Sequence, residues 1–354
     1  MERRKVLQSA IPALLLPWFS AKTWASTDTT ALSRHEPGSA ISIIQPRKPS
    51  FFPQGKSLEK YQHRLYQATM RFIQDHYSGR SMPIWHKPPE KVDLDNRIAN
   101  IAYWVIRSVK KHGATYPVDP AWLMAQIMEE SFFYEFAVSW SFASGICQFT
   151  LPTATSFGIV CPTTSRVAEE KLQQPEKAKA LDRLTALRKR KNKLENKNRK
   201  LFRNQEALFR KSLRKHARGT PLARAQEWLD ALNEMDSLEE SIRKARKEYR
   251  DFLRENYKGK SLFNPKDLDF LLQFDERVTY KKPIETMVKM MSRYMKGRNG
   301  NILAATAGYN AGLSRTYYPH AVYKPYGIIP NYDETVSYVS KIAVNHYEIV
   351  KRLT

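Results

Sequence analysis

The 354-residue sequence predicts a mainly α-helical protein with a packed core. Hydrophobic residues make up 42% of the chain and aromatic residues 12%, which is the composition of a folded rather than a disordered protein. Apolar residues recur at helical spacing in most segments, and several segments begin and end at residues typical of helix caps. No long stretch alternates apolar and polar residues as a strand does, so the predicted fold class is mainly α.

The N-terminal residues 1–25 are predicted to be an export signal. A basic start is followed by a short apolar run and then by small residues up to Ala25. A membrane anchor is the alternative, but Pro12 and Pro17 interrupt the run, which is shorter than the roughly 20 residues of a spanning helix. The arginine pair near the start leaves both Sec and Tat export open. Because of the export signal, the protein is expected in the periplasm or cell envelope. Residues 26–56, rich in Ser, Thr, Pro and Gly, are predicted to be a linker.

Charge and cysteine content limit the classes of partner and cofactor. The formal net charge of +24 predicts an anionic partner, namely nucleic acid, an anionic membrane surface or an acidic wall polymer. Nucleic acid is the least expected of these, because the export signal removes the protein from it. Cys147 and Cys161 could form a disulfide in an oxidising compartment or remain buried free thiols. No spacing typical of a metal site occurs, so neither a metal nor a cofactor is predicted.

Three helices are expected before the middle of the chain. The first spans 57–77, and the second begins at Asp93 or Asp95 and ends at Gly113 after a basic last turn. The third begins at Asp119 as N-cap, with a proline in its first turn, and continues through an almost wholly apolar run. A helix, a loop and a final helix are predicted to close the chain. Together these segments form one predicted domain in two parts, 57–164 and 261–354.

Residues 165–260 differ from the rest in charge and pattern. Between Arg166 and Lys260, 28 Lys and Arg oppose 15 Asp and Glu, a net charge of +13 (28 − 15), over half of the total. The first stretch carries leucines at seven-residue spacing: Leu187, Leu194, Leu201 and Leu208. Lys191, Asn198 and Gln205 lie between them, where a full heptad seam would carry apolar residues.

A break with Thr220 and Pro221 separates this stretch from a second one with unbroken helical spacing. The spacing is carried by Trp228, Ala231, Met235, Leu238, Ile242, Ala245, Tyr249 and Phe252. Two such stretches around a tight break predict an antiparallel helical hairpin. It is either a merely soluble hairpin or an arm that docks on a protein partner or an anionic envelope surface. We expect the domain to fold without residues 166–258.

Two carboxylates end the apolar third helix. Glu129 and Glu130 follow a run in which Leu123, Met124 and Ile127 are suited to a core. Desolvation there would raise the pKa of a carboxyl and keep it protonated near neutral pH, as a general acid requires. An ordinary exposed helix-end glutamate is the alternative.

Four segments occur in an order that resembles a known family. They are "VDPAWLMAQIMEESFF", "ASGICQFTLPTA", "GYNAG" and "IPNYDETVSYV". Together they resemble the catalytic domain of soluble lytic transglycosylases, a branch of the goose-type lysozyme-like enzymes. The resemblance implies a lysozyme-like fold in which residues 165–260 are an insertion, and a glycan of peptidoglycan as substrate.

The resemblance also implies roles for single residues. It makes Glu130 the catalytic acid and Gly145 the glycine of a structural turn. It implies substrate-binding roles for Ser139, Gln148, Tyr309, Asn310 and Glu334. The chain departs from the family pattern at Cys147, Thr150, Pro152 and Gly308, and these departures bear on saccharide preference more than on chemistry.

The implied reaction needs one carboxyl group. Glu130 would protonate the oxygen between muramic acid and glucosamine, with or without help from the substrate's acetamido group. As a carboxylate it would then deprotonate the 6-hydroxyl, which closes a 1,6-anhydro ring. The alternatives are a muramidase or chitinase on the same fold, a non-catalytic wall-binding or scaffolding module, and a nucleic-acid binder suggested by charge alone. Endo or exo cleavage and the biological role stay open at this point.

Overall fold

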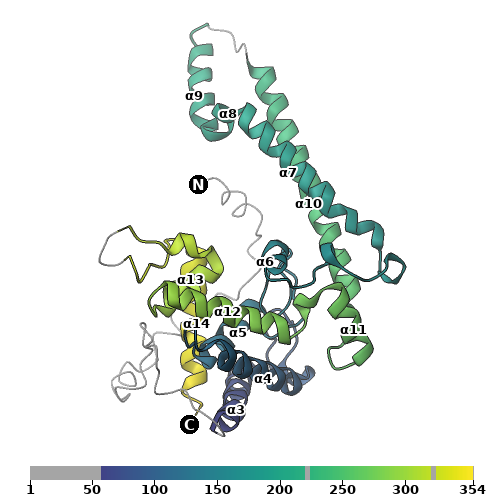
Figure 1. The fold of residues 1–354 in the computed structure, drawn as a ribbon. Helices are drawn as coiled ribbons and strands as arrows, with labels where there is room; N and C mark the ends of the chain where they lie inside the picture. The colour runs from purple at the N-terminus through teal and green to yellow at the C-terminus, as the bar shows by residue number, and fades with distance from the viewer. Residues whose placement is uncertain (1–56, 220–223, 320–323, 354) are drawn as a thin grey trace. The chain divides into compact units, whose positions relative to one another are not determined.

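The computed structural model describes residues 57–219, 224–319 and 324–353 (Figure 1). The predicted export signal, the predicted linker and the break at Thr220 and Pro221 lie outside these residues. The described chain is mostly helical and contains no strand, only isolated bridges that pair Val138 with Ser144 and Ser144 with Phe149. The predicted mainly α fold class is confirmed. None of the described helices is long and apolar enough to span a membrane.

Eight helices and several short turns of 3₁₀ helix lie outside residues 180–257 in the described chain. The helices are α3 (Ser57–Tyr77), α4 (Leu94–His112), α5 (Pro120–Ser131), α6 (Leu151–Ser156), α11 (Pro265–Phe274), α12 (Lys281–Gly297), α13 (Ile302–Ala311) and α14 (Asp333–Val350). The 3₁₀ turns are Pro89–Lys91, Pro162–Thr164, Glu169–Lys171, Pro175–Lys179, Glu276–Val278 and Leu313–Thr316.

Helix α5 lies at the centre of the packing. It contacts α14, α4 and α3, and side chains around its whole circumference are buried, among them Trp122, Leu123, Met124 and Ile127. The N-cap predicted at Asp119 is present, because its carboxylate accepts the backbone N–H of Ala121 at 2.9 Å. Asp93 caps α4 in the same way. A helix buried on every side leaves its C-terminal end as the place where polar groups can meet a substrate.

Residues 180–257 form the helices α7 (Ala180–Lys197), α8 (Arg199–Arg203), α9 (Gln205–His216) and α10 (Ala225–Tyr257). Helix α7 lies along α10 (Figure 1), and a cluster of Leu194, Leu201, Ala231, Met235 and Leu238 is buried between the two sides. The helix that precedes the break is interrupted at Asn198 and Asn204, near the polar positions of its leucine pattern. That this region is an insertion stays a prediction.

The C-terminal third of α10 belongs to the core that contains the predicted site. The ring of Tyr249 packs edge-on against Phe142 with centroids 4.8 Å apart, and that of Phe252 packs against Phe274 at 5.8 Å. The buried Tyr257 donates its phenolic hydrogen to Asp275 at 2.5 Å. This packing argues against our expectation that the domain folds without residues 166–258, because that excision removes these three aromatic side chains.

Candidate active site

Glu130 lies at the end of α5 and is bound by a side chain of α14. Its Oε1 accepts a hydrogen bond of 2.5 Å from the phenol of the buried Tyr338. Tyr338 in turn accepts a hydrogen bond of 3.1 Å from the amide of Gln126, one turn before Glu130 on α5. A buried relay from Gln126 through Tyr338 therefore fixes one oxygen of the Glu130 carboxyl group and leaves the other for a substrate.

The surroundings of Glu130 favour its protonated form. Its side chain is mostly buried, and desolvation raises its pKa from 4.5 to about 8. The hydrogen bond from Tyr338 acts in the opposite direction, while the negative charges of Glu129 and Glu334 raise the pKa further. Glu130 is thus not an ordinary exposed helix-end glutamate. At neutral pH it has a proton to give, which is the property that general acid catalysis requires.

The two neighbouring carboxylates are engaged elsewhere. Glu129 binds the ammonium group of Lys341 on α14 at 3.0 Å. Glu135 is completely buried and forms an ion pair with Arg97, whose Nε and Nη2 lie 3.0 and 2.8 Å from its Oε1. A buried ion pair of this kind is structural, since a lone buried charge would cost several kcal/mol.

Gly145 and Gln148 shape the turn that follows. Gly145 has a φ of +82°, and a Cβ at this position would lie 1.8 Å from the carbonyl oxygen of Arg277. Gln148 also has a positive φ, and its amide nitrogen donates to the carbonyl oxygens of Gly145 at 2.8 Å and of Ala137 at 3.2 Å. The amide nitrogen of Gln148 thus braces the turn, so only its oxygen is available to bind a sugar.

The remaining predicted residues lie around this centre in different ways. Half-buried Tyr309 donates its phenolic hydrogen to the carbonyl oxygen of Cys147 at 2.8 Å. Burial is the main reason that the pKa of Tyr309 is raised far above its usual range, and the charge of Glu130 contributes. Asn310 is exposed and accepts a hydrogen bond of 2.8 Å from Thr335. Glu334 is exposed in the first turn of α14.

Ser139 is held within its own loop rather than next to Glu130. Its hydroxyl oxygen accepts the backbone N–H of Ala143 at 3.0 Å and of Ser141 at 3.3 Å. The charge of Glu334 acts on Glu130, and that of Glu130 on Tyr309, whereas Ser139 lies in the loop that leads to Gly145.

Sequence reasoning missed Tyr338 as a site residue. The signal was present, because Tyr338 belongs to the segment "ETVSYV" and follows Glu334 by four residues, so both lie on one face of a helix. Only the packing of α14 against α5 shows that this phenol reaches Glu130.

The two cysteines are buried free thiols, the second of the two alternatives drawn from the sequence. Burial raises the pKa of the Cys147 thiol well above its ordinary value, and the charge of Glu130 adds to this effect. Both effects favour the uncharged thiol, so Cys147 contributes an uncharged, buried side chain to the surroundings of Glu130. In the described residues, no group of three His, Cys, Asp or Glu side chains could hold a metal ion.

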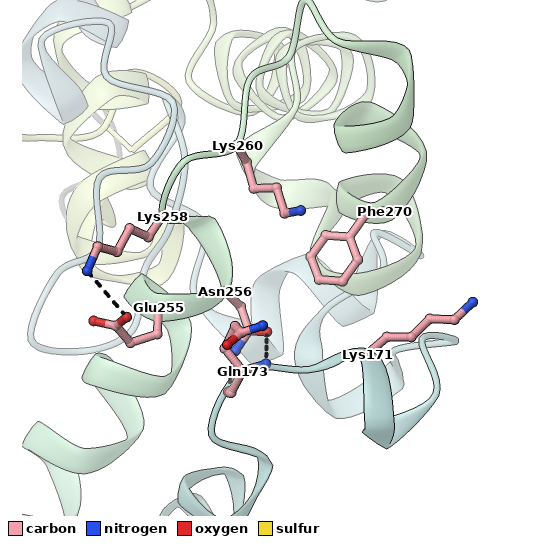
Figure 2. Close-up of a pocket in the computed structure, with 7 residues that line it drawn as sticks. All are labelled: Lys171, Gln173, Glu255, Asn256, Lys258, Lys260 and Phe270. Atoms are coloured by element: carbon pink, nitrogen blue, oxygen red, sulfur yellow. Dashed lines mark hydrogen bonds and ion pairs between the residues drawn. The ribbon is translucent and has the colours of Figure 1, made fainter.

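A separate cavity of about 260 Å³ lies between the end of α10 and α11 (Figure 2). Three of its lining side chains are lysines, and none of the predicted site residues lines it. Figure 2 shows Asn256 bound to Gln173, whose backbone N–H and carbonyl it engages at 2.9 Å each. These bonds fasten the chain before α7 to the end of α10.

We predict that Gly145→Ala strongly destabilises the protein, by roughly 3 kcal/mol or more. The new Cβ would force the backbone of Arg277 to move, and alanine would have to adopt the positive φ of Gly145. Thermal unfolding of purified protein measures this. The matched control is Gly158→Ala, which also has a positive φ of +68° but has nothing within 4 Å of the new Cβ. Equal losses for both variants would contradict the role given to the close approach.

Comparison with known proteins gives one family. A family model described as Transglycosylase SLT domain matches residues 107–199, which include Glu130, Ser139, Gly145 and Gln148. Comparisons with curated proteins and with solved structures gave no match. The family match supports a function of the lytic transglycosylase type that acts on peptidoglycan. Residues 107–199 are therefore similar to the transglycosylase SLT domain, and the resemblance to lytic transglycosylases predicted from the sequence is confirmed over this stretch.

Proposed function

We propose that the protein is a peptidoglycan lytic transglycosylase. It cleaves the β-1,4 bond between N-acetylmuramic acid and N-acetylglucosamine and leaves a 1,6-anhydromuramoyl end. The observation that carries this proposal is the position of the Glu130 carboxyl group, which lies mostly buried at the end of α5 and accepts a hydrogen bond of 2.5 Å from Tyr338. Burial there raises the pKa of Glu130 to about 8.

In the first step Glu130 acts as the acid. The carboxyl oxygen of Glu130 that Tyr338 does not bind gives its proton to the glycosidic oxygen. The bond between the glycosidic oxygen and C1 of the muramoyl residue then breaks. Positive charge develops at C1, and the substrate's own acetamido group is one source of stabilisation. The departing glucosamine leaves with a new hydroxyl group, so the proton and the electron pair of the broken bond are both accounted for.

In the second step the resulting carboxylate acts as the base. It removes the proton of the 6-hydroxyl, and O6 bonds to C1 to close the anhydro ring. No water enters, and Glu130 ends the cycle protonated as it began. The hydrogen bond from Tyr338 stabilises the carboxylate between the two steps, because a donor favours the charged form.

A single-carboxylate route agrees with the arrangement of the neighbouring acids. A two-carboxylate glycosidase places its second carboxyl group roughly 5 to 9.5 Å from the first, on the opposite side of the scissile bond. Glu129 is bound to Lys341, and Glu135 is buried against Arg97. Glu334 is the remaining predicted site carboxylate, and we assign it to sugar binding because it is exposed.

We assign positioning of the glycan to the groups around Glu130. These are Ser139, Gln148, Tyr309, Asn310 and Glu334. Gln148→Ala, Tyr309→Phe and Glu334→Ala should each lower turnover by less than Glu130→Gln does, because they bind sugar but move no proton. Initial rates on soluble glycan fragments measure this, and wild-type rates for all three variants would contradict the assignment.

Tyr338 is expected to set the alkaline limit of activity. Tyr338→Phe removes a donor that stabilises the Glu130 carboxylate, so the pKa of Glu130 should rise and the alkaline limb of kcat/KM should move to higher pH. The pH profile on soluble glycan fragments measures this. Tyr66→Phe is the control, since Tyr66 donates to the exposed Asp95 at 2.6 Å. An alkaline limb that stays in place or moves to lower pH would contradict the account.

Product analysis separates this function from its alternatives. Purified sacculi are digested with wild type and with Glu130→Gln, and the released muropeptides are identified by mass. An anhydro end, lighter by one water than a reducing end, supports the proposal. A reducing end identifies a muramidase-type hydrolase, and binding without any release identifies a wall-binding or scaffolding protein.

We further propose that the protein acts in the periplasm or cell envelope and that α9 faces an anionic envelope surface or protein partner there. Four basic side chains of α9, namely Arg210, Lys211, Arg214 and Lys215, line one pocket together with Arg218, which follows the end of the helix. Leu213 on the same helix is 61% exposed, and Leu229 of α10 is 52% exposed. A surface of exposed cations and leucines is suited to a negatively charged partner.

A further inference from the structure

The loop that contains Ser139 is short and internally bonded. Residues 138–144 close on themselves, because Val138 and Ser144 form a bridge and the N–H of Ser139 donates to the carbonyl of Ala143 at 2.9 Å. The loop leads directly into Gly145 and the turn of Gln148. Its conformation therefore affects where Ser139 and Gln148 lie relative to Glu130.

One residue of this loop has an unfavourable backbone conformation. Phe142 has a φ of +66°, which for a residue with a bulky side chain costs on the order of 1–3 kcal/mol. The ring of Phe142 is buried edge-on against Tyr249 of α10, with centroids 4.8 Å apart. Its carbonyl oxygen accepts a hydrogen bond of 2.6 Å from the buried Arg277. Burial against α10 offsets a conformation that the loop would not adopt alone.

The next residue of α10 holds the other side of the loop. The Nε of Arg250 donates to the carbonyl oxygen of Val138 at 3.2 Å. Its guanidinium carbon lies 4.3 Å from the centre of the Trp140 ring, close enough for a strong cation–π contact. In the described part of the chain, the side chain of Arg250 contacts a backbone carbonyl and an aromatic ring of this loop. Arg250 is thus placed to hold the loop.

We propose that α10 positions the substrate loop of the active site, with Arg250 as its positioning residue for glycan binding. Arg250 and Tyr249 hold residues 138–144 so that Ser139 and the half-buried indole of Trp140 face the glycan. This inference rests on the proposed function. It makes the α7–α10 region part of the binding apparatus instead of an appendage beside it.

The expected effect is on affinity more than on the chemical step. Without Arg250 the loop must be ordered when the substrate binds, so KM for a soluble GlcNAc–MurNAc tetrasaccharide should rise about tenfold in Arg250→Ala. The pH profile of kcat should stay that of the wild type, because Glu130, Tyr338 and Gln126 are untouched. Arg250→Lys should restore only part of the affinity, since an ammonium group does not reproduce the planar stacking of a guanidinium group.

The chain offers a matched control on the same helix. Arg246 lies one turn before Arg250, is also half-buried, and its Nε has no hydrogen-bond partner in the described structure. Arg246→Ala removes the same charge without touching the loop, so its KM should equal that of the wild type. Coupling is measured with Trp140→Phe and the double variant, whose effects on KM should not add.

The experiment measures the dissociation constant of the tetrasaccharide by calorimetry in a Glu130→Gln background, together with KM in active protein. Weaker binding for Arg250→Ala but not for Arg246→Ala supports the proposal, provided that thermal unfolding shows a cooperative transition for Arg250→Ala. Equal affinities for Arg250→Ala and wild type, or an equal loss in Arg246→Ala, would overturn it. A wild type that binds but does not cleave contradicts the proposed reaction alone, whereas one that does neither contradicts both.

Discussion

Glu130→Gln should lower the rate of glycan cleavage by about 10²- to 10⁴-fold, the range expected for loss of a general acid. The substitution keeps the volume and the hydrogen bond from Tyr338 but removes the proton that Glu130 transfers. Sedimentation with sacculi should be nearly unchanged. Initial rates of muropeptide release measure the effect, and Glu129→Gln is the control.

The same substitution should make the protein more stable at alkaline pH. Since the folded-state pKa of Glu130 is raised from 4.5 to about 8, ionisation of this carboxyl costs stability progressively as pH rises between these values. The amide has no such cost. The unfolding free energy of Glu130→Gln should therefore exceed that of the wild type by roughly 4 kcal/mol at most near pH 8 and match it near pH 4.

Two outcomes would contradict the assignment of Glu130. The first is inactivation by Glu129→Gln together with retained activity in Glu130→Gln, which would move the acid by one residue. The second is a Glu130→Gln variant that is less stable than the wild type at pH 8, which would show that the carboxyl is not held in a desolvating site.

Excision of residues 166–258 should prevent folding. It removes Tyr249, Phe252 and Tyr257, and loss of one large buried aromatic side chain alone typically costs about 3–5 kcal/mol. Three such losses approach or exceed the roughly 5–15 kcal/mol by which domains are stable. They also leave the buried ion pair of Asp275 and Arg277 without its phenol partner. Soluble yield and circular dichroism measure this outcome.

A shorter excision is the matched control. This variant lacks residues 192–238, and a short Gly-Ser linker bridges the gap. The removed residues lie beyond the ion pair of Lys191 with Glu239, which joins α7 to α10 at 2.5 Å. The three aromatic side chains remain, so this variant should fold and cleave soluble glycan fragments. It loses 11 basic and 6 acidic residues, a net charge of +5 (11 − 6), and should sediment less with sacculi at low salt. Equal folding of both excisions would contradict the place given to the end of α10.

Local signals in the sequence were sufficient for the helices of the domain. The capping carboxylates Asp93 and Asp119 and the helical spacing of apolar residues define α4 and α5 without reference to the rest of the chain. The run of apolar residues before Glu130 likewise predicted a desolvated carboxyl group. These features depend on neighbours within a turn or two of helix.

Features that join distant segments could not be read in this way. The bond from Tyr338 to Glu130 links residues 208 positions apart and needs α14 to pack against α5. The positive φ of Phe142 depends on a ring supplied by α10, more than a hundred residues later. A phenylalanine in that conformation has no sequence signature, because it is stabilised only by the packing that surrounds it.

The most direct test of the proposed reaction is digestion of sacculi in oxygen-18-labelled water, with mass analysis of the new glycan ends. If Glu130 closes the anhydro ring through the 6-hydroxyl, the muramoyl ends carry no label and are lighter by one water than reducing ends. Labelled reducing ends would show that water attacks C1, and the protein would then be a hydrolase.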